Sequence, residues 1–343
     1  MKLLPIKAPL LHSELRNRAM KTINNLRYRK VKFFYYLKNT ILFLIPRKFY
    51  QIQLQSELNK LDKYNRQYIL SRLNYYNKKI ENFTLSKNAL THKQLKMETL
   101  FKKFKHSAYF FDLYNIFSFF DSNKKLDCLF GDITDVPIAP SIVKSRPITD
   151  NNNSILMKLN RVRHFHFIND SRKFSDKKYG AVWRGNGNNS KIRQYFLQNY
   201  NHIPTFNIGQ RSPIIDTPWH KGFMSIYDQL DYKFIFCIEG HDVATNLKWV
   251  MSSNSICIMP KPRYETWFME GILKPDVHYI EVKDNFSDAE EKMSYYSENE
   301  TEALKIIENA HNHVEQFKDI KKEKLISLLV LDRYFSLSGQ NNA

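Results

Sequence analysis

The sequence predicts a mixed α/β protein, and two successive units of strand, turn and helix carry this prediction. In the first unit, an apolar strand over residues 180–184 leads through a turn of glycine and asparagine into a helix over 190–200. In the second unit, a strand over 233–238 is followed by a helix over 243–252 and a strand over 255–259. Strand, helix and strand in this order form the building block of a parallel sheet.

A long helical region precedes these units. Residues 11–104 contain no glycine, and Leu54, Leu58 and Leu61 recur at the three- and four-residue spacing of one helix face. Further apolar runs predict two strands and two C-terminal helices, at 126–130, 141–144, 303–317 and 324–335. The length of 343 residues and a hydrophobic content of 43% allow two domains with cores and exclude a disordered chain.

The positive charge of the chain is confined to its first third. Residues 1–105 contain 24 Lys and Arg but only 5 Asp and Glu, whereas the rest of the chain contains 29 residues of each sign. All of the net charge of +19 therefore lies in the helical region. This distribution predicts that the helical region meets an anionic partner and that the remainder does other work.

An apolar stretch within the basic region, Val31–Ile45, is interrupted by Lys32 and Lys38. It is shorter than the roughly 20 residues needed to span a bilayer. Two interpretations stay open: a helix that lies in a membrane interface, or a buried helix along which the lysine stems pack. The N-terminus has no small-residue cleavage site, so no secretory signal is expected, and the three cysteines show no pairing pattern, which favours a reducing compartment.

Two turns at strand ends carry groups that could bind a phosphate. Arg184 and Gly185 open the first turn with a guanidinium and a flexible backbone, and Ser190 can cap the helix that follows. Asp242 is predicted to cap the helix after the second turn. Taken alone, each turn also fits a plain structural role.

No metal site is predicted. The chain has no Asp-x-Asp, the carboxylate pair with which many sugar-nucleotide enzymes hold a divalent cation. The close histidine pairs, His164 with His166 and His311 with His313, have no acidic or cysteine cluster beside them in the sequence. We therefore expect neither a metal nor another cofactor.

The stretch Tyr232–Lys283 resembles glycosyltransferase family 90 in the order of its features. These are an aromatic strand ending in glycine, a helix with a lysine, a strand that begins with serine, an acidic and aromatic segment, and Leu-Lys-Pro-x-Val-His-Tyr. Residues 182–185 look like the family's aromatic-Arg-Gly turn, and 145–147 fit its bacterial branch of lipopolysaccharide core glycosyltransferases. The eukaryotic members include protein O-glucosyltransferases and capsule-associated xylosyltransferases. The resemblance covers roughly residues 127–292.

The resemblance implies a GT-B fold of two Rossmann-like lobes, with the nucleotide sugar held mainly by the C-terminal lobe, and inversion at the anomeric carbon. Such a reaction needs a base for the acceptor hydroxyl and positive charge for the departing diphosphate. In the protein O-glucosyltransferases the base is the aspartate of an Asp-x-x-x-Val-Pro segment, which Asp132 matches here. Asp135 is the nearby competitor, and a turn aspartate that binds backbone N–H groups is the structural alternative.

The resemblance also implies contacts to both substrates. The expected donor-binding residues are Arg184, Gly185, Asn246, Lys248 and Glu265, and the expected acceptor-binding residues are Lys144 and Arg146. Among them, Arg184 would contact the diphosphate and Glu265 the ribose. Asn246 stands where family members often carry an arginine, so Lys248 or Lys261 is the alternative source of charge.

These features predict an organisation in three parts. A basic helical region over 1–105 would dock on a membrane and the acceptor, a lobe over 106–160 would carry the base on the acceptor side, and a lobe over 161–320 would bind the nucleotide sugar. A helix over 321–338 is expected to pack back on the acceptor-side lobe.

The predicted function is that of a cytoplasmic glycosyltransferase that works at the anionic surface of the inner membrane. It would move a hexose from a UDP-sugar to a lipopolysaccharide core. This acceptor and the inner leaflet are both anionic, so both would attract the clustered positive charge of the helical region. Two alternatives stay open: a nucleic-acid-binding protein that uses the basic helices, or a glycosyltransferase for another acceptor such as capsule. Nucleic acid is not the expected partner, because no nucleic-acid module accompanies the charge.

Overall fold

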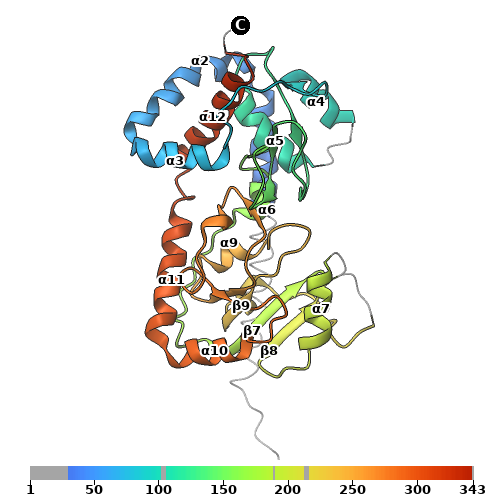
Figure 1. The fold of residues 1–343 in the computed structure, drawn as a ribbon, viewed down its shortest axis with the longest axis vertical. Helices are drawn as coiled ribbons and strands as arrows, with labels where there is room; N and C mark the ends of the chain where they lie inside the picture. The colour runs from blue at the N-terminus through green and yellow to red at the C-terminus, as the bar shows by residue number, and fades with distance from the viewer. Residues whose placement is uncertain (1–29, 102–105, 188–189, 212–215, 342–343) are drawn as a thin grey trace, which may run out of the picture.

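The computed structural model describes residues 30–101, 106–187, 190–211 and 216–341. The basic residues before residue 30, and residues 188 and 189 of the first predicted turn, lie outside these ranges. Figure 1 shows two parts. We call them the helical part, which contains α2 to α5 and α12, and the sheet part, which contains β7 to β10, β12 and the helices α7 to α11.

A five-stranded parallel sheet forms the centre of the sheet part, which confirms the predicted α/β class. Its strands are β7 (Lys178–Gly185), β8 (Phe206–Gln210), β9 (Tyr232–Phe236), β10 (Ile256–Met259) and β12 (Ile280–Glu281). Their order in space is β12-β10-β9-β7-β8, with every pair parallel. Along the chain, β8 is added on one side of β7, and β9, β10 and β12 are then added in turn on the other side. In such doubly wound sheets, ligands bind at the carboxyl ends of the strands where the direction reverses.

The strands form because their apolar runs are covered on both faces, as parallel strands require. In β9, Phe234 and Phe236 enter one core, where the ring of Phe236 lies 4.7 Å from that of Phe196 on α7. Ile235 enters a second core on the opposite face, together with Leu247 of α9. The helices of the sheet part are α7 (Lys191–Tyr200), α8 (Ile226–Gln229), α9 (Leu247–Val250), α10 (Ala289–Glu298) and α11 (Glu300–Glu315).

The helical part combines N-terminal helices with the C-terminal one. It contains α2 (Arg47–Leu58), α3 (Arg66–Tyr76), α4 (His92–Phe101), α5 (Ser107–Phe117) and α12 (Ile320–Leu337), and residues 30–44 are also helical. Helix α12 packs on α2, α3 and α5, and the ring of Phe335 lies 5.6 Å from that of Phe117. The described helices before residue 105 thus share their core with α5 and α12.

A small parallel sheet lies beside these helices. It consists of β3 (Cys128–Leu129), β4 (Ser141–Val143) and β6 (Ser154–Leu156), in the order β3-β4-β6. The short elements are η1 (Asn59–Lys63), β1 (Leu90–Thr91), β2 (Lys125–Leu126), α6 (Arg161–His164) and η2 (Glu270–Ile272). In the described part of the chain, no helix has both the length and the apolar character needed to cross a membrane.

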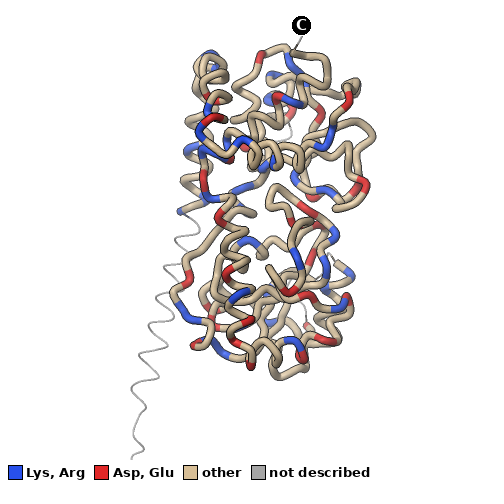
Figure 2. The backbone as a smooth tube through the Cα atoms, turned by 60° about the vertical axis from the view of Figure 1, so that its left-hand side comes forward, with Lys and Arg blue, Asp and Glu red and all other residues tan. Residues whose placement is uncertain are grey.

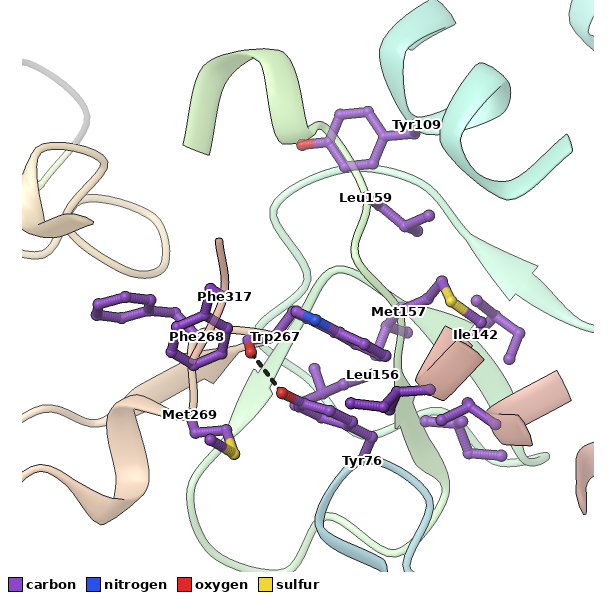
Figure 3. Close-up of a cluster of buried hydrophobic side chains, with 14 of the residues drawn as sticks. Tyr76, Tyr109, Ile142, Leu156, Met157, Leu159, Trp267, Phe268, Met269 and Phe317 are labelled. Atoms are coloured by element: carbon purple, nitrogen blue, oxygen red, sulfur yellow. Dashed lines mark hydrogen bonds between the residues drawn. The ribbon is translucent and has the colours of Figure 1, made fainter. Parts of the chain in front are cut away.

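A buried seam joins the two parts. Strand β5 (Ser145–Pro147) pairs antiparallel with β11 (Tyr264–Thr266). Directly beyond this pair, the ring of Tyr76 stacks on that of Trp267 at 3.7 Å, and the Tyr76 hydroxyl donates to the Trp267 carbonyl oxygen, as Figure 3 shows. Glu323 of α12 accepts from the Trp267 indole at 2.7 Å and pairs with Arg72 at 2.8 Å. These contacts hold the helical part at a fixed position over the sheet.

Candidate active site

A cleft of about 330 Å³ opens where β7 and β9 end, which is the point where the strand order reverses. Both parts of the molecule contribute to its walls. The lining residues are Asp132 and Thr134 from the helical part, Ser190, Lys191 and Ile192 at the start of α7, Gly240 and His241 after β9, and Arg263 and Tyr264 at the seam. The sequence-predicted base and the two predicted turns therefore meet in one cavity.

The N-terminus of α7 faces this cleft. Ser190 occupies the N-cap position, as the sequence predicts, but its hydroxyl donates to the carbonyl oxygen of Glu239 at 3.3 Å and makes no capping bond. The first-turn N–H groups of a helix without such a cap are available to a ligand, and the helix dipole favours an anion there.

Two arginines add positive charge near the cleft, Arg193 on α7 and Arg163 on α6, although neither is among its lining residues. The Arg193 guanidinium donates to the carbonyl oxygens of Ile238 at 2.7 Å and Asn186 at 3.3 Å. Its neighbour Gly240 has no side chain, and a Cβ there would lie 3.0 Å from the guanidinium. Burial, and then the nearby charge of Arg163, lowers the pKa of Arg193 to about 10, so it remains charged at neutral pH. Within the described residues neither arginine forms an ion pair, but the carboxylates of Asp242, Glu239 and Asp132 lie near enough to Arg193 to offset part of the lowering of its pKa.

Asp132 provides the opposite charge at the mouth of the cleft. Its Oδ1 accepts from the Lys144 ammonium at 2.5 Å and from the Tyr109 hydroxyl at 3.2 Å. Burial raises the pKa of Asp132, but Lys144, Arg163 and Tyr109 outweigh that effect and bring it below its ordinary value. Asp132 is therefore ionised at neutral pH and can accept a proton, whereas Asp135 lines neither cavity described here.

A narrow, mostly apolar crevice continues from the cleft along the ends of β9 and β10. Its lining includes Cys237, Val243, Ala244, Leu247, Met259 and Pro260, together with the charged side chains of Glu239 and Lys261. The two cavities share Ile192, Arg263 and Tyr264. The accessible space of the crevice is about 20 Å³, which is room for a single water molecule.

The five residues expected to bind the donor do not line the cleft. The Arg184 guanidinium turns toward β8, where it binds the Asn207 side chain at 2.8 Å and the Asn207 carbonyl oxygen at 2.6 Å. Gly185 is required by packing, since a Cβ there would lie 2.3 Å from the Trp183 ring. Asn246 donates to the Phe236 carbonyl oxygen at 2.9 Å.

Lys248 and Glu265 are fully buried in ion pairs. Lys248 pairs with Glu270, and Glu265 pairs with Arg146 at 2.7 Å and also accepts from Tyr75. Arg146, expected at the acceptor, is thereby part of the seam. Lys144, also expected there, is only 2% exposed and touches Asp132 and Asp242.

The helix predicted over 243–252 is shorter than expected. Helix α9 covers only Leu247–Val250, and Asn246 rather than Asp242 occupies its N-cap position. The prediction that Asp242 caps this helix is wrong because its carboxylate turns to Lys144, 2.5 Å away. No local pattern indicates this pair, which joins residues 98 positions apart.

The predicted histidine pairs do not converge. His164 is buried with both ring nitrogens unpartnered in the described structure, and burial brings its pKa well below the ordinary value. The ring nitrogens of His311 and His313 contact the carbonyl oxygens of Ser253 and Phe268. Across the described residues, no group of three or more His, Cys, Asp and Glu side chains is arranged to hold a metal ion.

Sequence reasoning missed Arg163 and Arg193. A signal for Arg193 was present, because it lies one helical turn after Ser190 and side chains on a helix lean toward its N-terminus. Arg163 gave no comparable signal, since α6 is a four-residue helix that enters the site only through the tertiary fold.

Comparison with known proteins identifies the class of enzyme to which this site belongs. A model of glycosyl transferase family 90 matches residues 102–337. The O-glucosyltransferase LpsA of Dichelobacter nodosus is 39% identical over 320 residues, which make up 90% of this chain and 96% of that protein. Protein O-glucosyltransferase 3 of Homo sapiens is 33% identical over 84 residues, 24% of this chain and 16% of that protein.

The protein is therefore a glycosyltransferase, an enzyme that takes a sugar donor and a glycan acceptor. More particularly, the chain belongs to glycosyl transferase family 90, because the family model covers more than half of it. The family resemblance predicted from the sequence is confirmed.

We predict that Arg193→Met weakens the binding of inorganic pyrophosphate by roughly 10- to 100-fold, because hydrogen bonds to charged groups contribute about 1.5–3 kcal/mol. Isothermal titration calorimetry measures this affinity. Arg184→Met is the matched control and should bind pyrophosphate as the parent does. The reverse result, with only Arg184→Met impaired, would return the anion site to the turn predicted from the sequence.

Proposed function

We propose that this glycosyltransferase transfers a hexose from a UDP-sugar to a lipopolysaccharide core acceptor with inversion at the anomeric carbon. The observation that carries the proposal is the cleft itself, which the ionised Asp132 of the helical part lines together with Ser190 and Lys191 at the α7 N-terminus of the sheet part. An inverting transfer needs its base and its leaving group on opposite sides of the sugar. A GT-B arrangement of two lobes provides these two sides.

In this proposal the diphosphate lies against the first turn of α7, between Arg163 and Arg193. The uracil ring lies against the opening of the apolar crevice that Met259 and Pro260 line. The hexose then projects toward the helical part and Asp132. This placement differs from the expected one, in which Arg184 and Glu265 hold the donor; in the structure both side chains bind other protein groups.

The chemistry follows from these positions. Asp132 takes the proton of the acceptor hydroxyl as its oxygen bonds to the anomeric carbon, and the bond from that carbon to the diphosphate oxygen breaks. The electron pair leaves with UDP, whose growing negative charge is stabilised by the two guanidinium groups and the helix dipole. Positive charge that is already fixed in place needs no rearrangement during the reaction.

The acceptor is proposed from two observations of different kinds. The relative that matches over 96% of its length is named O-glucosyltransferase LpsA, and the first 105 residues carry the whole net charge of +19. A phosphorylated inner core is an anionic acceptor that a region of such charge attracts. Incubation with a panel of UDP-sugars and truncated core acceptors, followed by mass measurement of the product, tests the function. An added hexose on a capsule fragment but on no core acceptor would favour the capsule alternative.

We predict that Asp132→Asn lowers turnover by roughly 10²- to 10⁴-fold, the usual contribution of a general base. The fold and the affinity for UDP should remain, because the amide has the same shape and the arginines are untouched. Steady-state kinetics and UDP titration measure the two quantities. Asp135→Asn is the control and should retain near-parental turnover, whereas the opposite ranking would transfer the role of base to Asp135.

We predict that transfer continues after exhaustive treatment with EDTA. Arg163, Arg193 and the α7 N-terminus already supply the positive charge that the departing diphosphate needs. Initial rates before and after chelation test this expectation. If transfer stops in EDTA and Mn²⁺ or Mg²⁺ restores it, the metal-free mechanism is wrong.

Peripheral membrane binding is proposed from an exposed apolar face near the N-terminus. One side of the helix over 30–44 packs on α5, where Tyr35 donates to Asp112 at 2.8 Å. The other side presents large apolar side chains to solvent, as does the start of α2. We call this set the apolar face: Phe33, Phe34, Leu37, Ile41, Leu44, Phe49 and Ile52. Ile52 and Leu44 are 78% and 74% exposed, and basic residues recur along the same edge of the molecule, at the upper left of Figure 2.

An amphipathic helix of this kind can lie in a membrane interface with its lysines among the headgroups. Burying even part of several such side chains is favourable, since a fully buried one contributes about 1.5–3 kcal/mol. The apolar face therefore favours the interfacial interpretation of Val31–Ile45 over the fully buried one.

We predict that replacing Phe34, Ile41 and Leu44 by Ser weakens association with anionic phospholipid vesicles by about tenfold or more. Vesicle co-sedimentation across a range of salt measures the effect. The control replaces three exposed apolar residues elsewhere, Ile80, Leu304 and Ile320, by Ser and should leave association unchanged. Equal binding of test and control variants would contradict the proposal, and tighter retention on duplex DNA than on vesicles would favour the nucleic-acid alternative.

A further inference from the structure

Lys144 lies between two carboxylates that belong to different parts of the molecule. Its ammonium is 2.5 Å from Oδ1 of Asp132 in the helical part and 2.5 Å from Oδ2 of Asp242 in the turn after β9. Lys144 is 2% exposed and Asp242 is 4% exposed, whereas the Asp132 side chain is 29% exposed and reaches the cleft. Of the three groups, only the candidate base is open to substrates.

The contacts of Asp132 are one-sided. Lys144 and the Tyr109 hydroxyl both bind Oδ1, and no hydrogen bond to Oδ2 is found among the residues that the structure describes. A carboxylate held by one oxygen cannot rotate freely, so the second oxygen is left for the acceptor hydroxyl. A base must lie within hydrogen-bond reach of the proton it removes, and a displacement of about 1 Å can lower the rate by roughly 100-fold.

Resting on the proposed function, we propose that Lys144 is a positioning residue that orients the base Asp132 and ties it, through Asp242, to the turn of the donor side. That turn also carries Gly240 and His241, which line the cleft. The donor site and the orientation of the base therefore depend on one ammonium group.

The second carboxylate keeps the Lys144 ammonium paired both before and after proton transfer. While Asp132 is ionised, Lys144 faces two negative groups. Once Asp132 has taken the acceptor proton, the buried ammonium still has Asp242 as a partner. A buried charge without a partner is costly, so a Lys144 paired with Asp132 alone would oppose the protonation that catalysis requires.

Electrostatics support the same role. Asp132 faces Lys144, Tyr109 of α5 and Arg163 of α6, and its charge also acts on Arg193 of α7. Burial raises the pKa of Asp132, and Lys144 is the strongest of the groups that lower it again. Loss of the ammonium would therefore raise the pKa of Asp132, and the base would become protonated, and inactive, at a higher pH than in the parent.

The test compares Lys144→Met with Asp242→Asn in the full chain. We expect Lys144→Met to lower kcat by about tenfold or more and to move the acid limb of the kcat profile upward by about one pH unit, the usual effect of losing a close opposite charge. Asp242→Asn should also lower kcat, but its acid limb should not move upward, because the Lys144 and Asp132 pair remains. Lys144→Arg keeps the charge and should restore the parental acid limb.

A second readout does not depend on activity. The ¹³C resonance of the Asp132 carboxyl group, assigned with Asp132→Asn, should titrate at a higher pH in Lys144→Met than in the parent. Equal titration in the two proteins, together with lower thermal stability of the variant, would make Lys144 a structural residue only and overturn the proposal. If Lys144→Met does not fold, the acid limbs of the kcat profiles of Lys144→Arg and Asp242→Asn are compared with that of the parent. An upward shift of the acid limb in Asp242→Asn overturns the proposal. Failure of the proposed function is seen separately, as the absence of product from the parent enzyme.

Discussion

The geometry of the cleft depends on the pairing of β5 with β11, because this is where the backbone of the helical part is hydrogen bonded to that of the sheet part. Arg146 and Glu265 lie opposite one another in this pair and form an ion pair of 2.7 Å with almost no exposure. The remaining guanidinium N–H groups donate to the carbonyl oxygens of Tyr75 at 2.7 Å and Ser154 at 2.8 Å. Buried charges are tolerated when they are satisfied in this way, whereas losing one partner costs about 3–5 kcal/mol.

The seam also determines where the charges of the cleft lie. Lys144 immediately precedes β5, so the pairing of β5 with β11 brings its ammonium to the junction of the two parts. Asp132 approaches from the loop after β3, and Asp242 from the turn after β9. Arg193 is placed independently, by helix α7 and the absence of a side chain at Gly240. A charge network that spans both parts thus depends on a backbone contact only three residues long.

The sequence predicted the local elements of the sheet part and the position of Asp132. The strands β7, β9 and β10 and helix α7 lie within about two residues of their expected bounds, because apolar runs and turn residues are local signals. The roles of charged residues were harder to predict. The family resemblance implies that Glu265 and Lys248 bind the donor, but in the fold both side chains are buried in ion pairs with Arg146 and Glu270. Arg146 is 119 positions away from Glu265, and no local pattern reveals such a pair.

The helical part connects the apolar face to the cleft through two layers of side chains. Tyr35, on the packed side of the helix over 30–44, donates to Asp112 of α5, and Asp112 also accepts from the backbone N–H of Arg161 at 2.8 Å. Arg161 begins α6, which carries Arg163 to the neighbourhood of Asp132. These buried contacts link the apolar face to the site. The apolar face can therefore hold the cleft at a fixed height and angle relative to the surface on which it lies. If the apolar face lies in a membrane interface, an acceptor anchored in that membrane would reach Asp132 from a constant direction, which is what an inverting displacement requires of its nucleophile.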